Sequence, residues 1–117
     1  MHCDSETVFS FSRIGFGGVF TEEYESVWEI SKTEAAKGHF SNMLTGKTNQ
    51  EKLYGLVGLK IIQSDEFDKS AEELEKIDGE LFYGGGGCII IQCTVKWAVD
   101  QVRQSGMIDP NRQGFQA

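Results

Sequence analysis

The stretch EKLYGLVGLKII, residues 51–62, decides the fold of this chain. A helix with this sequence is apolar almost all round, and such a helix must be buried. Gly55 and Gly58 lie one turn apart within it. Because a glycine inside a helix costs about 1 kcal/mol relative to alanine, the pair indicates that another backbone element packs closely against its bare face. The predicted structural core comprises Tyr54, Gly55, Leu56, Gly58, Leu59 and Cys88.

Helices are predicted upstream of this stretch from their start signals. Thr48–Glu51 has the capping-box pattern and opens the buried helix. Ser31–Glu34 has the same pattern, and the apolar residues after it recur at helical spacing, so we expect a second helix that ends near Thr45. Thr21 is the expected N-cap of a further helix, whose first turn carries glutamates that suit the positive end of the helix dipole.

Downstream, the segment Ser64–Phe67 leaves room for only a tight turn. The next helix, over residues 65–77, is therefore expected to run antiparallel to the buried one. It ends at Asp78–Gly79, and Thr94 is the expected N-cap of a final helix that ends near residue 105.

Extended segments are expected near residues 7–12, 81–83 and 88–92. The first alternates apolar and polar residues, and the other two flank four consecutive glycines. The predicted fold class is therefore mainly α, a single compact domain of about five helices in antiparallel pairs.

The domain boundaries follow from the same patterns. At 117 residues the chain has the length of one domain, which we expect to span residues 7–106. Residues 1–6 are expected to be disordered, and residues 107–117 to form a flexible C-terminal tail.

The charge balance constrains the class of partner. The formal net charge is -7, the sequence pI is about 4.7, and the 11 basic residues are scattered singly. Such a chain repels a phosphate backbone, so nucleic acid is not expected as a partner. A basic protein or peptide is favoured, because opposite charge accelerates encounter. No apolar run approaches the roughly 18 residues that cross a bilayer, so no membrane span is expected.

The N-terminal segment and the cysteines bear on the compartment. The first residues lack the basic and then apolar pattern of an export signal, so a cytoplasmic protein is expected. A periplasmic or lipid-anchored protein is the alternative, in which Cys3 carries the lipid after removal of an export signal.

Three cysteines are too few for a disulfide framework, and small buried thiols are expected. A bridge between Cys88 and Cys93, or from either one to Cys3, stays open.

No motif for a cofactor or metal is complete. Thr45–Thr48 imitates the end of a phosphate-binding P-loop, but Ser41 stands where the first glycine is required. Gly84–Gly87 precedes an apolar extended run where a phosphate site requires a helix. His2 and His39 are the only histidines, and no pair of metal ligands has local spacing. We therefore expect no cofactor and no metal.

Catalytic and binding candidates are few. Cys88 with His39 as base is the one nucleophilic pair to consider, and neither residue carries a surrounding signature. Trp97 falls at the edge of the inner stripe of the final helix, and aromatic anchors beside acidic residues are typical of protein recognition. Core packing is the alternative for these aromatic side chains. The candidate partner-binding residues are Trp97, Tyr83, Glu72 and Glu73.

The segments Lys52–Leu59 (KLYGLVGL), Ser64–Phe67 (SDEF) and Gly87–Ile90 (GCII), in this order, resemble a family of small bacterial proteins. This family includes an accessory protein encoded in microcin gene clusters, and the resemblance spans residues 48–105. Its members often carry a cysteine inside the first segment, at the position of Val57, so a disulfide from that position to Cys88 cannot form here. The resemblance implies a bacterial origin and a role around a secreted antibacterial peptide.

These observations predict a non-enzymatic protein-binding module. Its specific form would be an immunity or accessory protein for a secreted antibacterial peptide or toxin, with the acidic surface facing a basic partner. The alternatives are a small thiol-dependent enzyme that uses Cys88 with His39, and a structural subunit of a larger assembly.

Overall fold

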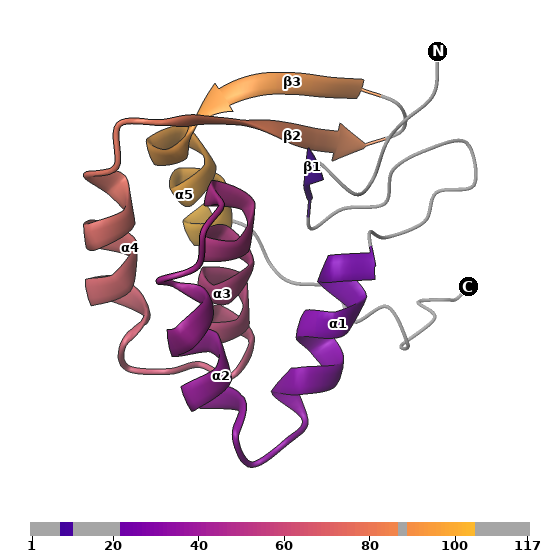
Figure 1. Ribbon diagram of the computed structural model, residues 1–117, viewed down its shortest axis with the longest axis vertical. Helices are drawn as coiled ribbons and strands as arrows, with labels where there is room; N and C mark the ends of the chain where they lie inside the picture. The colour runs from indigo at the N-terminus through magenta and orange to yellow at the C-terminus, as the bar shows by residue number, and fades with distance from the viewer. Residues whose placement is uncertain (1–7, 11–21, 87–88, 105–117) are drawn as a thin grey trace.

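The computed structural model describes residues 8–10, 22–86 and 89–104, and this part of the chain confirms the predicted mainly helical fold. The first four helices run alternately down and up the long axis, as antiparallel neighbours (Figure 1). The predictions for residues 1–6 and 107–117 lie outside the described residues. The elements are β1 (Val8–Phe9), α1 (Glu22–Ser31), α2 (Ala36–Met43), α3 (Asn49–Ile61), α4 (Phe67–Glu75), β2 (Glu80–Gly86), β3 (Ile89–Thr94) and α5 (Val95–Gln104).

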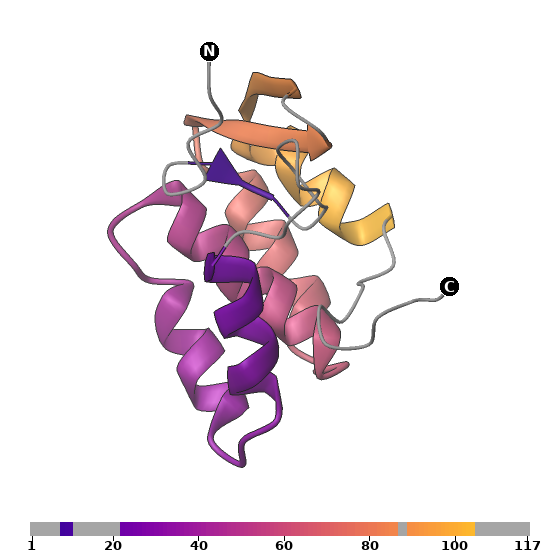
Figure 2. The same cartoon turned by 90° about the vertical axis from the view of Figure 1, so that its right-hand side faces the viewer.

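A three-stranded sheet lies across one end of the helical layer, above α3 and α5 (Figures 1 and 2). The strand order is β1-β2-β3, with β1 parallel to β2 and β2 antiparallel to β3. The hairpin register pairs Glu80 with Thr94 and Tyr83 with Ile91, and it shifts between Gly84 and Gly86. The extended segments predicted near 81–83 and 88–92 thus lie within β2 and β3, apart from Cys88, which is not described. The segment predicted near 7–12 contains β1, and its residues 7, 11 and 12 lie outside the described residues.

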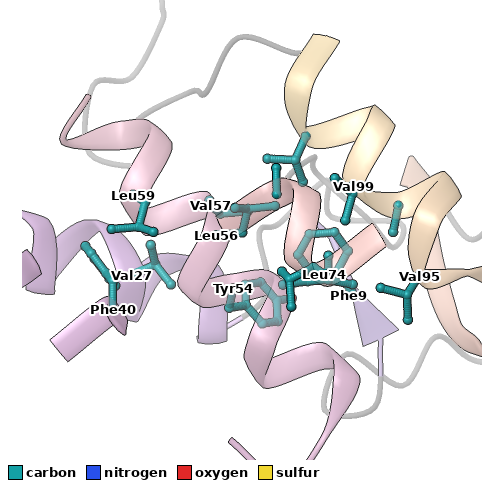
Figure 3. Close-up of a cluster of buried hydrophobic side chains, with 14 of the residues drawn as sticks. Phe9, Val27, Phe40, Tyr54, Leu56, Val57, Leu59, Leu74, Val95 and Val99 are labelled. Atoms are coloured by element: carbon teal, nitrogen blue, oxygen red, sulfur yellow. The ribbon is translucent and has the colours of Figure 1, made fainter. Parts of the chain in front are cut away.

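Helix α3 runs through the centre of the core, and seven consecutive residues from Leu53 to Leu59 are buried. A Cβ added to Gly55 would lie 2.9 Å from the backbone oxygen of Phe40 in α2. A Cβ added to Gly58 would fall on the Phe40 ring. Both glycines therefore allow α2 to approach α3 more closely than alanine would. Figure 3 shows Phe40 and Val27 beside Leu59 at one end of the buried cluster, with Val95 and Val99 of α5 at the other.

Of the four helix starts predicted from a capping residue, the one at Thr21 lies outside the described residues, and two of the other three agree with the structure. The Thr48 hydroxyl accepts a hydrogen bond from the Glu51 amide at 3.0 Å, and the Thr94 hydroxyl accepts one from the Trp97 amide at 3.1 Å. The capping box predicted at Ser31 is wrong. Helix α1 continues through Ser31, whose hydroxyl donates to the Trp28 carbonyl, and α2 starts only at Ala36 without a side-chain cap.

A buried polar contact holds the short strand β1 against the rest of the core. The Ser10 amide donates to the Tyr54 hydroxyl at 3.0 Å, and the Ser10 hydroxyl donates to the Gly84 carbonyl at 3.0 Å. The ring of Phe9 meets the ring of Tyr54 edge to face, with centroids 4.9 Å apart. Since Tyr54 belongs to α3 and Gly84 to β2, these contacts join three elements that are far apart in the sequence.

Polar side chains also fix the end of α5. The Lys60 ammonium of α3 donates to the backbone oxygens of Val102 and Arg103, the second at 2.8 Å. A cation at this place satisfies carbonyls that the last turn of a helix leaves without partners. The Arg103 guanidinium also pairs with the Glu75 carboxylate, which links α5 to α4.

Candidate functional site

A groove of about 450 Å³ lies between α1, the second half of α2 and the start of α3. Its apolar part consists of Val27, Ile30, Met43 and Tyr54, of which Val27 and Tyr54 are buried. Ser26, His39, Thr48 and Gln50 add polar groups, and Glu22, Glu23 and Glu51 add carboxylates. Ligand sites are usually concave and combine apolar side chains with polar groups that fix orientation, and this groove has both, with a larger polar share than most.

The charged residues that line this groove in the described part of the chain are all acidic. Three carboxylates line it, whereas no lysine or arginine does so among the described residues. Glu22 and Glu23 stand in the first turn of α1, and Glu51 stands in the first turn of α3. Each helix start contributes a partial positive charge of roughly half an elementary unit, which suits these carboxylates but leaves a negative balance. The described lining of the groove is therefore acidic, and a cationic partner matches it better than an anionic one.

The sequence-predicted partner-binding residues do not form one surface. Trp97 and Tyr83 meet edge to face, with ring centroids 5.1 Å apart. Tyr83 is only 8% exposed, and burial raises its pKa, so this residue belongs to the core. Glu72 and Glu73 are exposed on α4, and Glu73 faces α2 across a second hollow that Ser41 also lines.

For the alternative of a thiol-dependent enzyme, the described residues do not give the distance between Cys88 and His39. His39 is exposed on α2 and lines the groove, but Cys88 lies outside the described part of the chain. Cys93 is described, and it is a free thiol on β3. Burial, and secondarily the charge of Glu80, raises the pKa of this thiol. A catalytic cysteine requires the opposite shift.

We expect Cys93 to react slowly with a disulfide labelling reagent in the folded protein. In a C3S/C88S variant at pH 8, folded protein should react about tenfold more slowly than urea-unfolded protein, because the raised pKa and the burial both reduce accessible thiolate. The difference should shrink as the pH rises further. Equal rates in the folded and unfolded states would contradict this assignment.

The groove residues carry local signals that sequence reasoning explained in another way. Glu22 and Glu23 look like ordinary residues of a first helical turn, and Glu51 looks like the last member of a capping box. The informative signal would have been that two acidic helix starts occur in one small chain. Only the packing of α1 beside α3 brings them to the same groove.

Comparison with family models, with curated proteins and with solved structures yields no match to this chain. In the described residues, no group of three or more histidine, cysteine, aspartate or glutamate side chains is placed to hold a metal ion. No helix in the same residues combines the length and apolar character needed to cross a bilayer. The site is therefore characterised by its own geometry and charge.

Proposed function

We propose that this chain is a non-enzymatic module that binds a basic peptide or protein segment in the groove between α1, α2 and α3. The observation that carries the proposal is the combination of an apolar floor with three carboxylates and no lining lysine or arginine among the described residues. A lysine or arginine side chain matches such a surface, because its aliphatic stem packs on apolar groups while its charged head remains at the polar edge.

The positions of the carboxylates support a segment over a single small cation. Glu22 and Glu23 lie at one end of α1, and Ile30 lies two turns farther along the same helix, about 12 Å away. A partner that extends along α1 would place a cationic group near Glu22 and an apolar side chain near Ile30. An amphipathic basic peptide has both kinds of group.

The resemblance of the sequence to a family of small bacterial proteins suggests what kind of partner this protein would bind in the cell. We propose a bacterial immunity or accessory protein whose partner is a secreted antibacterial peptide or toxin. Support comes from the segment Lys52–Leu59 and from the net charge of -7, which favours encounter with a basic partner. Cytoplasmic residence belongs to the same proposal, and anchorage through Cys3 is the competing arrangement, which cell fractionation would distinguish.

The binding test uses a peptide of about 15 residues built from lysine and leucine, with a glutamate and leucine peptide of the same length as its control. We expect the basic peptide to bind and the acidic one not to bind. Replacing Glu22 and Glu51 with glutamine should weaken binding about tenfold, because both acidic residues line the groove. Calorimetric titration measures the dissociation constant.

The matched control is the pair Glu72→Gln and Glu73→Gln on α4, which removes the same charge away from the groove. This double variant should change the dissociation constant by less than about twofold. Binding should weaken strongly in 1 M salt, where the screening length falls to about 3 Å. Equal loss in both double variants, or binding that is indifferent to salt, would refute the groove as the site.

A further inference from the structure

Among the described residues, β3 is an edge strand with one unpaired side. The sheet order β1-β2-β3 leaves it with β2 on one side, and no described residue pairs with its other side. Figure 1 shows it as the outermost strand, above the helical layer. An edge strand presents a row of backbone donors and acceptors that can pair with another strand.

The sequence of β3 lacks the usual protection of such an edge. Ile89–Thr94 reads IIIQCT, with no charged residue and no proline. Native proteins commonly place a lysine or proline on an exposed edge, or keep the strand very short. At six residues β3 has ordinary strand length, and its one irregularity of register lies at the end next to Gly86.

Exposed apolar side chains lie on both faces of the hairpin that contains this edge. The large hydrophobic residues that are exposed in the described chain are Phe82 at 48%, Ile91 at 42% and Trp97 at 37%. They belong to β2, to β3 and to the first turn of α5, which directly follows β3. Ile91 pairs with Tyr83 and therefore shares its face of the sheet, where the Trp97 ring also contacts Tyr83, whereas Phe82 pairs with Gln92 on the opposite face. Aromatic residues are enriched in the buried centres of protein interfaces, so Ile91 and Trp97 indicate a contact surface at this edge.

The charge around the edge favours a second copy over a basic peptide. From residue 80 to residue 97 the sequence carries one acidic and one basic residue, Glu80 and Lys96, although the whole chain has a net charge of -7. A basic peptide finds no row of carboxylates along β3. Two copies, in contrast, meet here without placing their acidic helices against each other. The hairpin is therefore the part of this acidic chain that is best suited to self-association.

We propose that β3 pairs in antiparallel orientation with β3 of a second copy of this chain, so that one sheet continues through both copies. This pairing is isologous, because each copy offers the same uncharged strand. Pairing of β3 with β1 of another copy would build a fibre, but within the described residues β1 comprises only Val8–Phe9, against six residues in β3. The lengths of the two edges therefore favour a closed dimer. The dimer is independent of peptide binding in the groove.

Sedimentation equilibrium over a range of concentrations tests the proposal. The wild-type chain should reach twice its 13.0 kDa mass as concentration rises. Ile91→Lys should raise the dimer dissociation constant at least about tenfold, because a buried lysine charge opposes strand pairing. Gln92→Lys should act in the same direction, and it keeps a nitrogen donor beside the Glu80 carboxylate, with which Gln92 now makes a 2.7 Å hydrogen bond. If Ile91→Lys fails to fold, the Gln92→Lys variant therefore tests the dimer instead.

The control is Glu72→Gln, which changes the net charge by the same amount at an exposed site on α4 and should leave the dissociation constant within about twofold. Added salt should tighten the dimer, since it screens the repulsion between two acidic copies, whereas it weakens peptide binding. A monomer at every concentration, or a dimer that tolerates both lysine variants in folded form, would overturn the proposal.

Discussion

Replacing Gly58 with alanine is expected to lower the free energy of unfolding by about 3 kcal/mol, at the upper end of the usual cost of overpacking a core. The added Cβ would fall on the ring of Phe40, which is fully buried and cannot move aside without disturbing α2. This cost exceeds the gain of about 1 kcal/mol that alanine normally brings to a helix interior. Urea denaturation followed by circular dichroism measures the difference.

Gly38→Ala is the matched control, because it makes the same chemical change in a neighbouring helix. Apart from its own helix backbone and its two chain neighbours, no atom of the described residues lies within 4 Å of the Cβ that it would add. This variant should be more stable than the wild type by up to about 1 kcal/mol, through helix propensity and the smaller entropy of the unfolded chain. If the two variants had equal stabilities, the close approach of α2 to α3 would be wrong.

Replacing Tyr54 with phenylalanine is expected to cost about 2 kcal/mol. The ring and its edge-to-face contact with Phe9 would remain, but the Ser10 amide would lose its acceptor inside the core. A buried donor without a partner costs about 1–3 kcal/mol, more than the net gain from an average hydrogen bond. The same urea denaturation measures the loss.

Amide hydrogen exchange locates the effect of this substitution. The Ser10 amide, which is buried with the Tyr54 hydroxyl, should exchange faster in the variant, relative to amides of α4, because the contact between β1 and α3 is weakened. Unchanged protection of this amide, together with a stability loss below about 0.5 kcal/mol, would show that the hydroxyl does not hold β1 in place.

Local chemistry explains the features that the sequence predicted correctly. Thr48 and Thr94 cap helices because a threonine hydroxyl reaches an amide three residues ahead, whatever the rest of the fold does. The buried character of α3 follows from its composition in the same way, since an element that is apolar all round has no face for water. The five helices were therefore predictable as separate elements.

The capping box predicted at Ser31–Glu34 shows where a prediction from local sequence fails. Its residues match the capping pattern, yet α1 continues through Ser31, and Lys32 and Thr33 extend the turn by bonding to carbonyls of α1. Tyr24 and Val27 of α1 are buried in the core, and packing of this kind outweighs the contribution of one cap, which is about 1 kcal/mol. A capping pattern alone could not predict where the first helix ends.

By itself, the sequence determined the number and type of the helices, the burial of residues 53–59 and the acidic character of the chain, because these depend on composition and on contacts within a few residues. Only the tertiary structure decided which carboxylates share a groove and which strand is left at the sheet edge. In the sequence, α2 lies between Glu22 and Glu51, so only packing brings these residues to one groove. Strand β3 is at the edge because β1 pairs with the other side of β2. Such relations depend on packing between distant segments, which no local pattern encodes.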